Sequence, residues 1–295
     1  MIKKKEIKVS ALLADILAKE EIKHPLYHGA WIAGGFARAM AHHALIGDGR
    51  RQAEYIVDYF IQKDQSGFGG PPDIDIFSFP GNTAYIDFVT KLENKRSYEI
   101  FAKNTYVRIL SKRDGIAQGV KVQYIIFEDF MHEDIEACFK SFDLVNAQYA
   151  LYRDDDGKVY VKYTDEALIA DTAKLVKVNG VSSPYLGSRI LKYQGVKGCT
   201  NGLDPESVDL LRAWCYNIIT KTWMTPLMGT KRGVPNETYI QKQISRLFVG
   251  GVLSESALTI FVNKWRVNIS TYNRGGTEFV EHVKQMRRDY EARIQ

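Results

Sequence analysis

Two aspartates alternate with two isoleucines in a short predicted strand. Residues 73–79 read DIDIFSF, which places Asp73 and Asp75 on one face and Ile74 and Ile76 on the other, because successive strand residues point to opposite faces. Neighbouring carboxylates repel each other unless a cation lies between them, and hard divalent cations prefer oxygen ligands. The pattern therefore indicates a magnesium site.

A third aspartate, Asp143, stands at the start of a further predicted strand over residues 142–152. Neighbouring strands lie about 5 Å apart, so three carboxylates on adjacent strands can meet in one small volume. Two magnesium ions held by Asp73, Asp75 and Asp143 would clamp the attacking and leaving oxygens of a phosphoryl transfer. Taken singly, the same acids also fit an exposed strand pair, a cap or a salt-bridge partner.

A glycine pair, Gly34-Gly35, separates a predicted strand at 31–33 from a predicted helix at 36–46. Glycine allows close approach of the backbone to a ligand, and a helix N-terminus offers N–H groups to a phosphate. Arg38, one turn into the helix, would add a charged donor to a triphosphate. A Gly-Gly pair by itself more often marks an ordinary turn.

In this order the motifs resemble the nucleotidyltransferase superfamily with the DNA polymerase beta fold. The segments that carry the resemblance are Gly34-Gly35-Phe36-Ala37-Arg38, Asp73-Ile74-Asp75-Ile76-Phe77 and Phe142-Asp143. They are similar to the GGxxR and DxD motifs of CCA-adding enzymes and bacterial poly(A) polymerases, and phages and large viruses also encode proteins of this type. The resemblance implies catalysis and metal binding by the three aspartates and triphosphate binding by the two glycines.

A basic segment adds to the resemblance. Ser188-Arg189-Ile190-Leu191-Lys192-Tyr193 is similar to the arginine-rich helix that follows the catalytic domain in that superfamily. Arg189 and Lys192 lie three residues apart on one helix face, and the resemblance implies that they contact nucleotide. A basic helix face in water would show the same spacing.

Two features depart from the family pattern. Asp73 follows Gly35 by 38 positions, a longer spacing than usual, and a predicted helix at 54–62 is inserted between them. Ala39 stands where CCA-adding enzymes carry an acidic residue after the arginine.

The predicted elements divide the chain near residue 180. Before it, further strands are expected at 104–111, 119–127 and 158–163, with helices at 9–20 (ended by His24-Pro25), 83–94, 132–140 and 164–174. After it, only helices are expected, at 185–194, 205–221, 236–248, 254–265 and 276–293. We predict an α+β fold: a nucleotidyltransferase-type mixed sheet with flanking helices at 1–180, and an all-helical domain at 181–295 that binds nucleotide or acceptor.

Composition narrows the class of protein. The 295 residues are 45% hydrophobic and 25% charged, which excludes a wholly disordered chain. Three cysteines without a CxxC pair argue against a disulfide framework and a zinc ribbon. We expect no membrane partner, because no apolar run is long enough to span a bilayer, and no signal peptide. The expected location is the cytoplasm, that of the host if the protein is encoded by a phage or virus.

Charge is unevenly distributed. Residues 1–180 carry 24 Lys and Arg against 26 Asp and Glu, whereas residues 181–295 carry 16 against 9. Basic surfaces attract polyanions, and Lys231-Arg232 and Arg287-Arg288 are candidate phosphate contacts. We therefore expect magnesium-dependent transfer of a nucleoside monophosphate from a nucleoside triphosphate, such as ATP, to an RNA 3′ end. Two alternatives stay open: the same chemistry on a protein, a tRNA in the manner of a toxin, or a small molecule; and a non-catalytic nucleic-acid-binding module.

Overall fold

The computed structural model describes residues 1–61, 72–103, 107–112, 120–127, 133–180 and 186–211, and the single residues 284, 285, 288 and 292. The chain forms two compact units. One consists of Met1–Lys63 and Gly70–Asn179, and the other of Asp64–Gly69 and Gly180–Gln295. The division near Gly180 coincides with the change in charge along the sequence.

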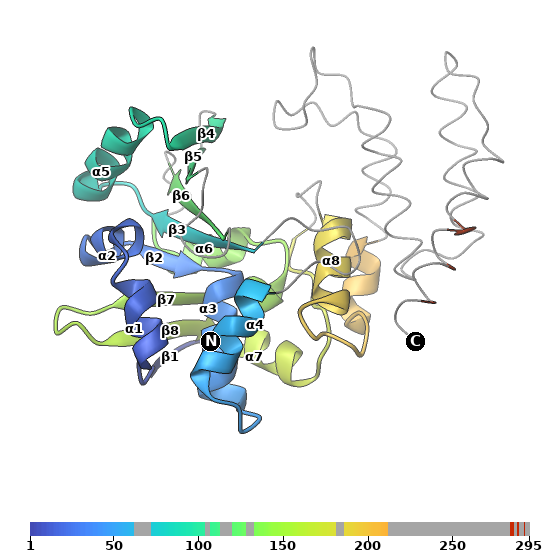
Figure 1. Ribbon diagram of the computed structural model, residues 1–295. Helices are drawn as coiled ribbons and strands as arrows, with labels where there is room; N and C mark the ends of the chain where they lie inside the picture. The colour runs from blue at the N-terminus through green and yellow to red at the C-terminus, as the bar shows by residue number, and fades with distance from the viewer. Residues whose placement is uncertain are drawn as a thin grey trace, which may run out of the picture. The chain divides into compact units, whose positions relative to one another are not determined.

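The first unit is built on one eight-stranded sheet, in the order β1-β8-β7-β2-β3-β6-β5-β4 (Figure 1). Neighbouring strands are antiparallel except β3 and β6, which run parallel. The strands are β1 (Ile2–Glu6), β2 (Trp31–Ala33), β3 (Asp73–Ser78), β4 (Tyr98–Lys103), β5 (Val107–Lys112), β6 (Lys121–Phe127), β7 (Tyr149–Arg153) and β8 (Val159–Thr164).

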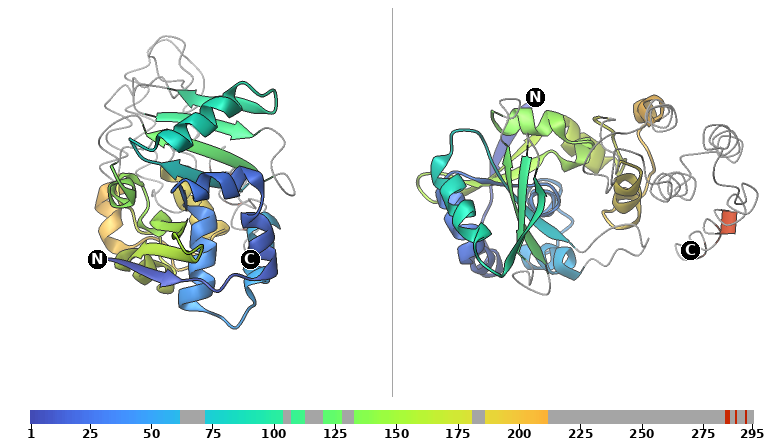
Figure 2. Two further views of the ribbon diagram at one scale, coloured as in Figure 1. Left: turned by 90° about the vertical axis from the view of Figure 1, so that its left-hand side faces the viewer. Right: turned by 90° about the horizontal axis from the view of Figure 1, so that it is seen from above.

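Helices cover both faces of this sheet, and in the view from above the blue N-terminal helices lie along one side of it (Figure 2). They are α1 (Ala11–Leu17), α2 (Glu20–Tyr27), α3 (Gly35–Ala41), the π-helical η1 (His42–Ile46), α4 (Gln52–Ile61), α5 (Thr83–Glu93), α6 (Ile135–Ser141), the 3₁₀-helical η3 (Val145–Ala147) and α7 (Asp165–Thr172). The mixed sheet with flanking helices confirms the predicted fold class.

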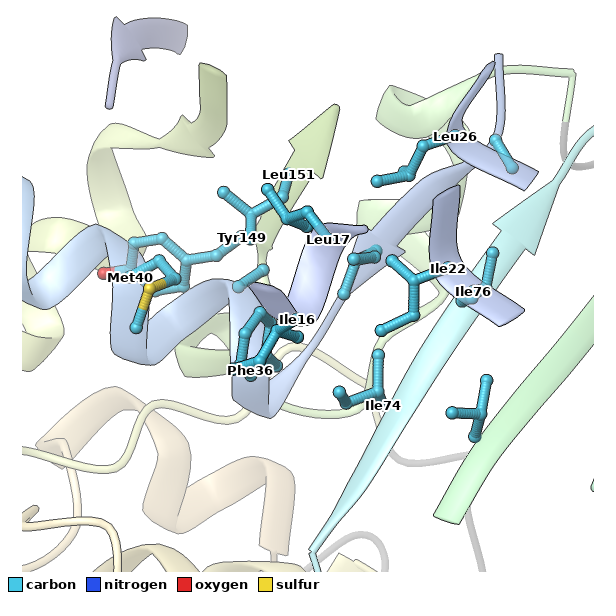
Figure 3. Close-up of a cluster of buried hydrophobic side chains, with 14 of the residues drawn as sticks. Ile16, Leu17, Ile22, Leu26, Phe36, Met40, Ile74, Ile76, Tyr149 and Leu151 are labelled. Atoms are coloured by element: carbon cyan, nitrogen blue, oxygen red, sulfur yellow. The ribbon is translucent and has the colours of Figure 1, made fainter. Parts of the chain in front are cut away.

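The larger core lies on the face that carries Ile74 and Ile76, where α1, α2 and α3 contribute their apolar side chains (Figure 3). A smaller core lies on the opposite face, where Phe139 of α6 packs with Phe77 and Ala33. The aspartates of β3 therefore share their face of the sheet with α6.

Several helices begin at a polar side chain that accepts a first-turn N–H, a preferred way to start a helix. These caps are Ser10 for α1, Asn82 for α5, Asp134 for α6 and Thr164 for α7. Thr164 also ends β8, so the chain passes from strand to helix without a loop.

Helix α2 overturns one prediction, that His24-Pro25 ends a helix. α2 runs to Tyr27 with Pro25 inside it. Proline lacks the N–H that would bond the carbonyl four residues earlier, which is that of Glu21. The hydroxyl of Tyr124 donates to this carbonyl at 3.1 Å, so the missing hydrogen bond is replaced from β6.

The predicted strand at 142–152 is also wrong in its first half. Only Tyr149–Arg153 is a strand, and Val145–Ala147 is a 3₁₀ turn. Asn146 accounts for the turn: its side-chain nitrogen donates to the Leu175 carbonyl at 2.9 Å, and its side-chain oxygen accepts the Lys177 N–H at 2.8 Å. These bonds attach the segment to the chain after α7 instead of to a strand.

In the second unit, helix α8 (Leu186–Gly195) confirms the prediction at 185–194, and residues 205–211 are helical as expected. The helices predicted at 236–248 and 254–265, and Lys231-Arg232, lie outside the described residues. No helix in the described part of the chain has the length and apolar character needed to cross a membrane.

Candidate active site

The junction between β2 and α3 requires glycine. Gly34 has φ +81° and ψ −138°, a backbone conformation that residues with a Cβ rarely adopt. Its N–H donates to the Tyr149 carbonyl at 3.1 Å, and α3 begins at Gly35 and continues into η1 as far as Ile46. The first-turn N–H groups of such a helix have no acceptor within the helix and favour an anion.

Asp75 lies directly beside this junction. Ala33 of β2 pairs with Asp75 of β3, and a Cβ built on Gly34 would lie 3.8 Å from Asp75 Oδ2. The glycine backbone and the carboxylate therefore line the same small volume.

The alternation predicted for β3 is confirmed. Asp73 and Asp75 are half-buried on one face, whereas Ile74 and Ile76 are fully buried on the other. The strand thus presents two carboxylates together on the face that α6 covers, opposite the larger core.

The inserted helix α4 holds the start of β3. The hydroxyl of Tyr59 donates to the backbone carbonyl of Asp73. The same ring packs edge-on against Phe36, with centroids 5.3 Å apart, and Phe36 follows Gly35 in α3. Tyr59 therefore contacts both the glycine helix and the aspartate strand.

Asp143 does not open a strand, contrary to the sequence prediction. It lies between α6 and η3, with 4% of its surface exposed, and its backbone carbonyl accepts the Asn179 N–H at 2.8 Å. The preceding ring, Phe142, contacts Phe77 at a centroid distance of 5.9 Å. Since Phe77 shares a face with Asp75, the segment that carries Asp143 adjoins the same face of the sheet.

Arg38 has a different environment from the predicted one, in which it faced a triphosphate. Its side chain is buried and forms a two-pronged ion pair with Asp171 of α7, through Nε at 2.9 Å and Nη2 at 2.8 Å. His42 contacts the same carboxylate at 2.7 Å, and Asn146 donates to it at 2.7 Å. The structure therefore uses Arg38 to join α3 to α7, and sequence reasoning missed Asp171 because nothing in its local pattern marks the partner.

The charges in this cluster follow from its burial. Burial alone would raise the pKa of Asp171, but the charge of Arg38 and the hydrogen bonds from His42 and Arg38 outweigh it and hold the pKa well below its ordinary value. Burial lowers the pKa of His42, and Arg38 lowers it further, against the effect of Asp171. His42 is therefore neutral at pH 7 and donates its Nε2–H to Asp171 as a hydrogen bond.

Arg189 and Lys192 both belong to α8, in the second unit. Arg189 is exposed and Lys192 half-buried, whereas Ile190 and Leu191 are buried. The two cations thus lie on the polar side of an amphipathic helix, and their contact with nucleotide stays a prediction.

The two carboxylates of β3 are suitable ligands for a magnesium ion that is also bound by substrate phosphates. Within the described ranges, no three His, Cys, Asp or Glu side chains gather closely enough to hold a metal ion, so the expected set of three carboxylates is not assembled there. Magnesium is commonly bound by one or two carboxylates together with substrate phosphates. Asp73 and Asp75, beside the glycine junction, supply two.

Comparison with solved structures places the fold among nucleotidyltransferases. A CCA-adding enzyme in complex with CTP matches with a TM-score of 0.51 and 9% sequence identity, covering 98% of this chain and 70% of that one. A CCA-adding enzyme in complex with ATP matches with a TM-score of 0.51 and 11% identity, over the same shares of the two chains. At such identities the likeness concerns the fold alone, and it agrees with the nucleotidyltransferase-type fold that the motifs indicated.

No protein of curated function matches the chain by sequence. Residues 3–174 match the model of a protein family described as "Gabija anti-defense 2 family protein". The matched range spans β1 to α7 and includes both glycines, the three aspartates and the Arg38–Asp171 pair. The chain belongs to the Gabija anti-defense 2 family.

Proposed function

We propose that the protein transfers a nucleoside monophosphate from a nucleoside triphosphate to an acceptor hydroxyl, with release of pyrophosphate. The observation that carries the proposal is the position of the Asp75 carboxylate beside the β2–α3 junction, where a Cβ built on Gly34 would lie 3.8 Å from Asp75 Oδ2. An anion-binding backbone and a cation-binding carboxylate side by side suit a metal-bound triphosphate. The CTP and ATP complexes of the structurally similar CCA-adding enzymes support the choice of substrate.

Each part of the site has a distinct role in this proposal. Asp73 and Asp75 would hold magnesium, which when bound neutralises charge on the phosphates and on the leaving pyrophosphate. Gly34, Gly35 and the first turn of α3 would hold the β- and γ-phosphates. We assign Asp143 to the proton of the attacking hydroxyl, because its segment adjoins the face of Asp75 while the described residues form no three-carboxylate cluster.

The first candidate acceptor is an RNA 3′ end. Residues 181–295 carry 16 Lys and Arg against 9 Asp and Glu, and the amphipathic α8 carries Arg189 and Lys192 on its polar side. A basic domain in the same chain as a catalytic domain would draw in a polyanionic acceptor.

The family name favours a second candidate. It describes an activity against a defence called Gabija. Transfer of a nucleotide to a hydroxyl group on a protein of that defence would use the same residues of the first unit and would inactivate the protein by modification.

One labelling experiment tests the function and separates the acceptors. The protein is incubated with magnesium and each of the four ribonucleoside triphosphates labelled at the α-phosphate, together with RNA or with proteins of the Gabija defence. If the protein transfers nucleotide, one of the two pools becomes labelled. An Asp73→Asn/Asp75→Asn variant that keeps its thermal stability should label neither pool. Label in neither pool, with a folded wild type that binds triphosphate, would refute both candidate acceptors.

Salt dependence tests the RNA acceptor independently. The logarithm of the affinity for single-stranded RNA should fall with the logarithm of salt concentration by about 0.7 for each phosphate contacted. Charge reversal at Lys231-Arg232 should flatten this slope and leave triphosphate binding unchanged. A weak affinity that does not respond to salt would count against RNA and favour a protein acceptor.

A further inference from the structure

The register partners of Asp73 and Asp75 on the two neighbouring strands are not acidic residues. In the antiparallel pairing with β2, the residue beside Asp75 is Ala33. In the parallel pairing with β6, Gln123 lies beside Asp75 and Lys121 beside Asp73. Register partners point to the same face of a sheet, and neighbouring strands are about 4.8 Å apart. Gln123 and Lys121 therefore border the carboxylate pair.

Gln123 and Lys121 make the surroundings of the two carboxylates less negative than acidic neighbours would. Gln123 is neutral and half-buried, at a position from which a carboxylate would reach the same cation as Asp75. Lys121 is positive, and its Nζ lies 4.0 Å from Oε1 of Glu99, a residue of β4. Among the described residues, β3 and its two neighbouring strands thus offer a free metal ion two carboxylates, with a lysine beside them.

Charge count and the number of oxygen ligands set the affinity of a site for a hard cation. Magnesium requires six oxygens in near-octahedral geometry, and two half-buried carboxylates leave most of these to water or substrate. A triphosphate supplies further anionic oxygens, and the adjoining glycine junction is suited to hold its phosphates.

We propose that the site binds its divalent cation only together with the triphosphate, and that Gln123 is the residue that imposes this dependence. The inference rests on the proposed function, because it concerns the same two carboxylates. The metal-free protein then has no appreciable affinity for magnesium or manganese alone at this site, and the metal–triphosphate complex is the species that it recognises.

Equilibrium dialysis with manganese as the probe tests the proposal without relying on activity. Manganese retained by the full chain is measured with and without each ribonucleoside triphosphate, for the wild type, Asp73→Asn/Asp75→Asn, Gln123→Glu and Gln285→Glu. Gln285 is exposed and belongs to the second unit, so its variant adds the same charge outside the unit that carries the aspartates. Thermal unfolding confirms that each variant is folded.

Without nucleotide, the wild type should retain no more manganese than the Asp73→Asn/Asp75→Asn variant, and with a suitable triphosphate it should retain clearly more. Gln123→Glu should bind manganese without nucleotide at least about tenfold more tightly than the wild type, by adding a third carboxylate, whereas Gln285→Glu should match the wild type.

Tight wild-type binding of manganese alone that is lost in the Asp73→Asn/Asp75→Asn variant would overturn this inference while leaving the proposed function intact. Gln123→Glu that folds but gains no affinity would also overturn it. Failure of the wild type to bind any triphosphate with manganese would instead refute the proposed function.

Discussion

Removal of Asp171 should destabilise the protein far more than loss of a surface ion pair. Its side chain is 0% exposed, and that of its partner Arg38 is 6% exposed. The carboxylate also accepts hydrogen bonds from His42 and Asn146. Asp171→Ala leaves a buried guanidinium without its counter-charge, a change that typically costs about 3–5 kcal/mol.

For a protein of this size, 1 kcal/mol corresponds to a shift in Tm of about 2–4 °C, so Asp171→Ala should lower Tm by roughly 6–20 °C. Thermal unfolding followed by circular dichroism measures the shift. Arg51→Ala serves as control, because it removes an exposed ion pair with Glu54 and should leave Tm nearly unchanged. Asp171→Asn keeps an acceptor oxygen but loses the charge, so its Tm should lie between those of Asp171→Ala and Arg51→Ala. A Tm for Asp171→Ala within about 3 °C of the wild type would refute the view that this pair joins α3 to α7.

Four further outcomes follow from the site. Asp75→Asn should abolish nucleotide transfer in the labelling assay without loss of folding. Gly34→Ala should lower the free energy of unfolding by about 1–2 kcal/mol, because the φ of +81° at this position disfavours a residue with a Cβ. Urea unfolding measures this loss. Tyr59→Phe should lower the free energy of unfolding by about 1 kcal/mol. It should also raise KM for the triphosphate, because the backbone carbonyl of Asp73 loses its hydrogen bond. The lowered pKa of His42 means that the unfolded chain takes up a proton more readily than the folded one, so stability should decline as pH falls below about 6.5. His42→Phe should reduce that decline in urea unfolding at pH 7.5 and 5.5.

Local patterns in the sequence were sufficient to predict β3 and the glycine turn that follows β2. Strict alternation marks β3 because Ile74 and Ile76 face the larger core while the half-buried Asp73 and Asp75 share the opposite face. The glycine pair marks the end of β2, where Gly34 has φ +81°. Each of these features depends on a few consecutive residues, so each is visible without knowledge of the fold.

Features that depend on partners far along the chain could not be predicted in this way. β1 has mostly exposed, charged residues, and it is a strand because it pairs with β8 at the sheet edge, where lysines are common. Pro25 is tolerated because Tyr124 supplies a hydroxyl from β6. Arg38 is engaged by Asp171, which lies 133 residues away. Only the tertiary structure brings these pairs together.

The helix inserted between the glycine pair and the aspartates has a structural reason to be there. The insertion lengthens the chain between two motifs that have to act on one ligand, which by itself would loosen their relative placement. Tyr59 of α4 opposes this effect, since its ring packs on Phe36 and its hydroxyl holds the backbone of Asp73. The first residue after the glycines and the first aspartate are therefore fixed to the same side chain. The added helix maintains the geometry that its own length would otherwise disturb, and this explains how the motif spacing can depart from the family pattern while Asp75 stays beside the β2–α3 junction, paired with Ala33.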